Sequence, residues 1–207
     1  MIITYLGQEF FKVQFGDIVL AVNPISKQSK HKTTRFGADV ALISVHDADH
    51  NGVEQVENAG KEPFVIDGPG EYEVKGVSVR GFLAKQNDTD ALLNSVYAVS
   101  LEDINLCFLG SGEGSELDAS TKEALGEVDI LFVPIGADAK SASLAYKRSI
   151  ALEPGVIIPS YDDGPREALK IFLKEGGVEG LAPIEKLTVR KKDVLGKEGE
   201  IVVLSHA

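Results

Sequence analysis

Two histidines and two aspartates fall within five residues of the chain: His46, Asp47, Asp49 and His50. They follow an apolar run, residues 38–45, that predicts a buried strand, and functional side chains often gather where a strand ends on a rigid scaffold. Imidazole and carboxylate groups at such short spacing are typical ligands of a borderline divalent ion such as zinc. A polar turn after a strand, without a ligand, is an equally good interpretation of the same residues.

A second pattern, Gly110-Ser111-Gly112, also follows a predicted strand and could present Ser111 as a nucleophile with His50 as its base. The Gly-x-Ser-x-Gly pattern of a nucleophile turn is absent, because Leu109 stands where the first glycine belongs. The same glycines lack the Lys-Ser/Thr of a phosphate-binding loop. A serine hydrolase and a phosphate loop are therefore the weaker alternatives.

The net charge of the chain limits the kinds of partner that it can bind. Asp and Glu number 32 against 21 Lys and Arg, so the net charge of the 207 residues is 21 − 32 = −11. Such an acidic surface repels phosphate backbones, so we expect no nucleic-acid partner. No apolar stretch approaches the length of a membrane span and the N-terminal residues do not resemble a signal peptide, so we expect a cytoplasmic protein with no membrane partner.

Two smaller features complete the chemical inventory. Residues 27–35 carry four cations and His31, and they predict a solvated loop that could contact an anionic partner. Cys107 is the only cysteine, which excludes an internal disulfide and a multi-cysteine zinc site. Because it lies within an apolar run, we expect a buried, inert thiol.

The elements that must position these residues are mainly strands in the first half of the chain. Apolar runs bounded by Gly, Pro and Asn predict strands at residues 2–6, 10–15, 18–22, 38–45, 64–66, 72–80, 95–100 and 105–109. Later runs predict strands at residues 128–135, 156–159, 186–190 and 200–205. Helices are expected from Asp118 to about Gly126, from Ser141 or Ser143 to about Glu153, and from Pro165 to about Lys174.

Both halves of the chain contain strands that read as buried on both faces. Two mixed β-sheets flanked by helices would cover those faces, which places the chain in the α/β class. No linker-like stretch separates the halves, so the sequence predicts a single domain over residues 1–207. His206, next to the C-terminus, is expected to be disordered.

Several landmarks occur in a characteristic order and spacing over residues 1–163. They are Ile3-Thr-Tyr-Leu-Gly7, Asn23-Pro24, Asp67-Gly-Pro-Gly-Glu-Tyr72, Phe108-Leu-Gly110, Leu131-Phe-Val-Pro-Ile-Gly136 and Ile157-Ile-Pro159. Through these landmarks the chain resembles the metallo-β-lactamase superfamily, and within it the branch of small predicted zinc-dependent hydrolases. The resemblance implies an αβ/βα four-layer sandwich, metallo-β-lactamase-like, that agrees with the predicted elements.

The family's metal ligands are mostly replaced in this chain. The family motif reads Ser/Thr-His-x-His-x-Asp-His, and matching it on Asp49 and His50 puts Val45 and Asp47 at the two other histidine positions, with His46 at the variable position between them. The remaining ligand positions that the resemblance implies hold Gln86, Ser111 and either Tyr161 or Ser160. Two supporting positions change as well, to Gln8 and Asn23.

These replacements lead to the expected function. A metal held only by Asp47, Asp49 and His50 would be held from one short loop and would bind weakly, and without a Lewis acid no water is activated for hydrolysis. We therefore expect a metal-free hydrogen-bonded cluster with no cofactor. The protein would be a catalytically inactive or nearly inactive relative of the hydrolases, binding a small molecule or a protein.

The alternative is a Zn- or Mn-dependent hydrolase with a reduced site around Asp47, Asp49 and His50. Asp162 would be a further ligand, and Asp49 would be the residue on which activity depends. A symmetric dimer, or another homo-oligomer, is compatible with the sequence only on general frequency, because no residue pattern indicates one.

Overall fold

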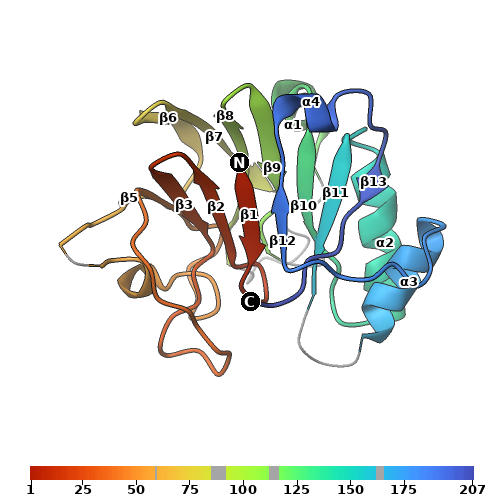
Figure 1. The fold of residues 1–207 in the computed structure, drawn as a ribbon, viewed down its shortest axis with the longest axis horizontal. Coiled ribbons are helices and arrows are strands. Elements are labelled where there is room, and N and C mark those ends of the chain that lie inside the picture. The colour runs from red at the N-terminus through yellow and green to blue at the C-terminus, as the bar shows by residue number, and fades with distance from the viewer. Residues whose placement is uncertain (59, 85–91, 112–116, 162–165) are drawn as a thin grey trace.

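The structure is a computed structural model of the chain, and it describes residues 1–58, 60–84, 92–111, 117–161 and 166–207. Two mixed β-sheets face each other (Figure 1). The six-stranded sheet has the order β12 (Lys186–Thr188), β1 (Ile2–Tyr5), β2 (Phe11–Phe15), β3 (Ile18–Val22), β4 (Val40–Leu42) and β5 (Phe64–Ile66). The seven-stranded sheet has the order β13 (Glu200–Ile201), β11 (Val156–Ser160), β10 (Ile130–Pro134), β9 (Ile104–Phe108), β8 (Asn94–Leu101), β7 (Val77–Ala84) and β6 (Gly70–Val74).

The helices lie around these sheets. They are α1 (Ala119–Leu125), α2 (Ala139–Ile150), α3 (Glu167–Glu175), α4 (Lys191–Val194) and one 3₁₀ turn, η1 (Val53–Gln55). Figure 1 shows α2 and α3 beside the β11 and β13 end of the seven-stranded sheet. The expected α/β architecture of two mixed sheets with helices is confirmed.

The alternation of side chains along the strands produces two apolar layers. Leu20 and Leu42 belong to the large buried cluster that both sheets share. Their neighbours Ala21 and Ala41 point to the opposite face of the six-stranded sheet, where they pack in a second cluster with Phe10, Ile25, Ala38 and Val56. The six-stranded sheet is thus buried on both faces in its centre, as the continuous apolar runs predict.

Helix α2 begins earlier than predicted. Asp138 is its N-cap, and its carboxylate accepts a hydrogen bond of 2.8 Å from the Ser141 amide, so Ser141 lies inside the first turn. Asp118 caps α1 as predicted, accepting a hydrogen bond from the Thr121 amide. The carboxylate at each N-cap satisfies an amide that has no partner within its own helix.

The C-terminal residues are ordered, so the expected disorder of His206 is wrong. The backbone forms a parallel bridge between Tyr5 and His206, and the amide of Ala207 donates to the carbonyl of Tyr5. The His206 ring meets the Tyr5 ring edge-on, with 4.7 Å between centroids. Backbone pairing and ring packing together fix a tail that would otherwise fray.

The structure also bears on the expected state of Cys107 and on the expected absence of a membrane span. Cys107 is buried, and burial raises the pKa of its thiol to about 12, which agrees with an inert side chain. None of the helices in the described parts of the chain has the length and apolar character to span a membrane.

The topology gathers the candidate residues at one edge of the sandwich. Strands β1, β3 and β4 run in the same direction, and so do β9, β10 and β11 in the other sheet. The loops that follow β1, β4, β9 and β11 carry Gln8, Asp47, Ser111 and Tyr161, respectively. The amide of Ser95 donates to the carbonyl of Ser44 and joins the two sheets at this edge.

Candidate functional site

Asp47 shapes the loop that follows β4. Its carboxylate oxygen Oδ1 accepts hydrogen bonds from the amides of Asp49, at 2.9 Å, and His50, at 3.0 Å. The same oxygen lies 2.7 Å from Nδ1 of the His50 ring. Asp47 therefore organises the backbone and orients the imidazole at the same time.

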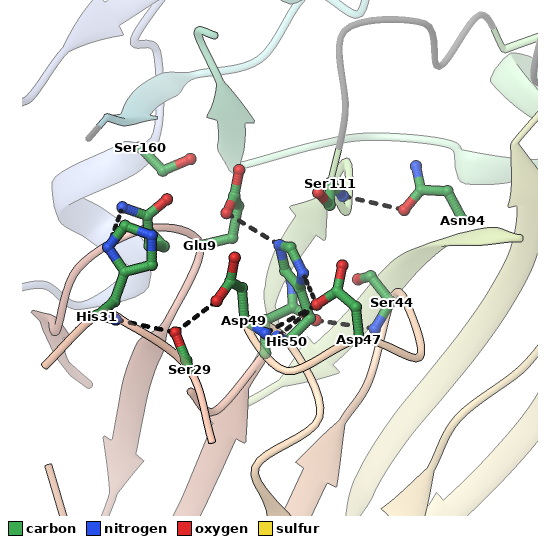
Figure 2. Close-up of polar contacts among 12 residues, drawn as sticks. Glu9, Ser29, His31, Ser44, Asp47, Asp49, His50, Asn94, Ser111 and Ser160 are labelled. Carbon is green, nitrogen blue, oxygen red and sulfur yellow. Dashed lines mark hydrogen bonds and ion pairs between the residues drawn. The ribbon is translucent and has the colours of Figure 1, made fainter. Parts of the chain in front are cut away.

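The second partner of His50 comes from a distant part of the chain. Glu9, in the loop between β1 and β2, places Oε2 3.0 Å from Nε2 of His50 (Figure 2). Glu9 is not among the residues that the sequence indicated. It lies beside Gln8, one of the supporting positions, but nothing in its own type or spacing indicates a contact 41 residues away.

His50 is held as a cation between these two carboxylates. An ionised carboxylate only accepts, so bonds at both ring nitrogens require both to carry a proton. Burial acts to lower the pKa of His50, but hydrogen bonds and charge attraction from Asp47 and Glu9 outweigh burial and raise this pKa to about 9. For Asp47, burial opposes ionisation, and the contact with His50 reverses this and lowers the pKa of the carboxyl group.

These contacts bear on whether the residues fit a metal ion. A histidine ligand needs one ring nitrogen with a free lone pair, and both nitrogens of His50 face carboxylates. Asp49 accepts a hydrogen bond from the Ser29 hydroxyl. Across the described residues, no group of three or more His, Cys, Asp and Glu side chains is arranged to hold a metal. In this arrangement neither ring nitrogen of His50 offers a free lone pair to a metal ion.

The other family positions are occupied by groups with different roles. Val45 is buried and apolar. The amide of Ser111 donates to Oδ1 of Asn94 at 2.9 Å. The Tyr161 hydroxyl donates to the carbonyl of Leu204 at 2.6 Å, which directs this side chain toward the C-terminal segment. Gln86 and Asp162 lie outside the described residues.

His46 does not join the cluster. Its side chain is 55% exposed, and its ring lies 3.6 Å from Asp67 and within hydrogen-bond distance of the Asn51 amide group. Ser44, two residues earlier, is buried at the loop's start, and its amide donates to Oδ1 of Asn23. The residue types alone could not separate His46 from His50, whereas the family register does.

The serine hydrolase alternative also fails on geometry. A general base must have a nitrogen that can take the serine proton, and the His50 ring already donates from both nitrogens. The structure thus brings Asp47, Asp49 and His50 together and adds Glu9 and Ser29 (Figure 2). It gives Ser111 no base in His50.

The two facing sheets carry an Asp- and His-bearing loop at the carboxyl end of β4. Residues 2–161 match the sequence profile of the Beta-lactamase superfamily domain. The chain belongs to the β-lactamase superfamily, and its fold is that of the metallo-β-lactamases.

Solved structures share this fold. A proposed Zn-dependent hydrolase of the metallo-β-lactamase superfamily from Thermotoga maritima is 26% identical, with a TM-score of 0.73 over 98% of this chain and 97% of its own. A metallo-hydrolase from the archaeon Ignicoccus hospitalis, 16% identical, has a TM-score of 0.59 over 91% and 99% of the two chains. The metallo-β-lactamase fold protein YhfI from Bacillus subtilis, 12% identical, has a TM-score of 0.61 over 99% and 97%. No curated protein sequence matches the chain.

Proposed function

We propose that this hydrolase-like protein is a catalytically inactive or nearly inactive member of its superfamily and acts as a binding protein. The observation that carries the proposal is the pair of carboxylates, Asp47 and Glu9, on the two ring nitrogens of His50. The imidazolium supplies a positive charge between carboxylates, which is the electrostatic role that a metal ion has in a metal site. The charges of Asp47 and Glu9 are then balanced by a side chain of the protein itself.

Metal content tests this proposal directly. The chain is produced in zinc-supplemented medium, purified without chelator, and its bound metals are quantified by elemental analysis. We expect far less than one zinc per chain, and a melting temperature that neither zinc nor chelator shifts, because a ligand that binds only the folded state must raise its stability. One or two tightly bound zinc ions per chain would overturn the proposal.

A metal-dependent hydrolase remains the second candidate function, and the similarity to the Thermotoga maritima protein favours it. In that case Asp47, Asp49 and His50 would bind Zn²⁺ or Mn²⁺ after His50 gives up a carboxylate partner. Hydrolysis of phosphodiester, ester or lactam substrates would then rise with added metal and disappear in Asp49→Ala. We expect no such metal-dependent activity, and the exposed-site variant His46→Ala serves as the matched control.

A further inference from the structure

Residues 27–35, which we call the basic loop, have a charge opposite to that of the rest of the molecule. The loop contains Lys27, Lys30, Lys32 and Arg35 and no acidic residue, so its charge is +4. The remainder of the chain then carries −11 − 4 = −15. A local charge of this sign on an acidic molecule attracts anions to one place and repels them elsewhere.

Specific hydrogen bonds attach the basic loop to the candidate site. The Ser29 hydroxyl donates to Oδ1 of Asp49 and accepts from the amide of His31, at 3.0 Å. Nε2 of Gln8 lies 3.2 Å from Nδ1 of the His31 ring. Because an amide nitrogen only donates, Nδ1 of His31 accepts, and the ring proton is on Nε2. The loop is thus positioned over Gln8 and Asp49 by its own polar side chains.

The lysines of the loop are not neutralised by the contacts that the structure describes. Lys27, Lys30 and Lys32 are exposed, and none of them forms an ion pair within the described parts of the chain. Lys61 and Lys75, by contrast, both pair with the buried Asp39. The three loop lysines are therefore available to a ligand.

Arg35, the fourth cation, adds less positive potential to the loop, because it lines a hollow together with the acidic residues Glu57 and Glu62. Glu54 also lies under the loop, where its carboxylate accepts from the Lys27 amide. The segment 30–32, which contains Lys30, His31 and Lys32, has no acidic group among its described polar contacts.

The composition of the loop indicates the size of its ligand. No apolar or aromatic residue occurs between residues 27 and 35, whereas protein interfaces depend on buried apolar or aromatic anchors. The acidic remainder of the chain opposes a long polyanion or an anionic membrane, since both would extend beyond nine residues. A small, multiply charged anion needs no apolar anchor and does not extend onto the acidic remainder of the surface.

We infer that the basic loop is a binding site for a small anion with at least two negative charges, held at the mouth of the Asp49–His50 loop. The inference rests on the proposed binding role of this site and names the ligand class. Phosphate and carboxylate groups share this chemistry. Lys30, Lys32 and the Nε2–H of His31 would donate to the anion, with Lys27 adding charge from the edge.

The test measures binding of pyrophosphate and of citrate to the full chain by titration calorimetry. The protein is depleted of metal and then desalted, because a chelator is itself an anion. At an ionic strength of about 0.02 M we expect dissociation constants at or below about 1 mM, weakening toward 0.15 M salt. The two probes separate a phosphate ligand from a carboxylate ligand. Amide chemical-shift changes should centre on residues 27–35.

A charge-matched pair of variants decides where the anion binds. The triple variant Lys27→Gln, Lys30→Gln and Lys32→Gln should bind about tenfold more weakly, as expected from losing three exposed charge contacts. The control, Lys122→Gln, Lys147→Gln and Lys174→Gln, removes the same charge from exposed positions on α1, α2 and α3 and should bind like the parent.

Three results would overturn the inference: no binding of either probe, equal weakening in both triple variants, or binding only of a single-stranded oligonucleotide or anionic vesicles offered in parallel. These results are independent of the zinc analysis. A metal-free protein that binds neither anion refutes the inference alone, and a zinc-loaded protein refutes the proposed function alone.

Discussion

At the residue scale, the candidate site depends on how the charges around His50 are balanced. A buried imidazole with two carboxylate neighbours is most stable when it is protonated, because otherwise one partly buried carboxylate loses its donor. The sequence indicated Asp47, Asp49 and His50 by type and register. It could not indicate Glu9, because a single glutamate near a strand end has no local pattern that distinguishes it from a surface residue.

Removing the charge of Glu9 should therefore weaken the fold. Glu9→Gln keeps the shape of the side chain but takes one negative charge away from His50, and we expect a loss of about 1–3 kcal/mol in unfolding free energy. Urea denaturation at neutral pH measures this loss. The control is Asp67→Asn, next to the exposed His46, which should change stability by less than about 0.5 kcal/mol. Equal stabilities for the two variants would contradict the assignment of Glu9.

A second residue-scale prediction concerns Asp39. Its carboxylate is buried and accepts from Lys61, Lys75 and the amide of Val19. Desolvation acts to raise the pKa of Asp39, but these hydrogen bonds outweigh it and lower the pKa to about 2. Since the folded-state pKa is depressed, the stabilisation is complete above the model-peptide value of 3.8 and is lost as the pH falls through about 2.

The test compares the parent with Asp39→Asn by urea denaturation at several pH values. The difference in unfolding free energy should be about 2 kcal/mol at pH 7 and should shrink as the pH approaches 2. A difference that stays constant over this range would show that the carboxylate charge contributes nothing.

At the element scale, the sequence predicted most strands but not their limits. Continuous apolar runs marked the central strands correctly, because those strands are buried on both faces. The run at residues 38–45 forms a strand only over Val40–Leu42. Asp39, just before it, pairs with lysines through its side chain, and Ser44, just after it, already belongs to the site loop. Helix α2 starts at Ala139 because Asp138, rather than a serine, caps it.

One glycine at a strand end has a specific role in the site. Gly110 follows β9 with a φ of 76°, and a Cβ there would collide with the side chain of Asn94, which binds the Ser111 amide. Gly110→Ala should destabilise the protein by more than about 2 kcal/mol, since strain and collision add. Gly16→Ala is the control: it has a φ of 54° but open space, so its cost should be about 1 kcal/mol in thermal or urea unfolding. Similar costs would mean that Asn94 moves aside freely.

At the scale of the whole molecule, the final third of the chain joins the two sheets. Strand β12 pairs with β1 in the six-stranded sheet, and β13 pairs with β11 in the seven-stranded sheet. Apolar runs predicted strands near both places, but strand partners more than 40 residues away are set by tertiary packing that periodicity does not encode. The family resemblance gave the overall fold, and the pairing of this tail had to come from the structure.

The Tyr161 hydroxyl connects this tail to the core. Tyr161→Phe leaves the buried carbonyl of Leu204 without its donor and should cost about 1–1.5 kcal/mol. Tyr146→Phe on α2 is the comparison, since the Tyr146 ring meets the Phe172 ring edge-on and this contact does not involve the hydroxyl group. Calorimetric melting of the two variants measures the difference, and a melting temperature for Tyr161→Phe equal to that of the parent would remove this connection from the account.

Because the thiol of Cys107 in β9 is buried, its reactivity can report how often the fold opens. Cys107 is 1% exposed, so its thiolate can attack a chromogenic disulfide reagent, and release the coloured thiolate, only when the strand opens to solvent. The rate of colour development in native buffer then measures how often the strand is released to solvent. Each variant above can be ranked by this one readout, without denaturant.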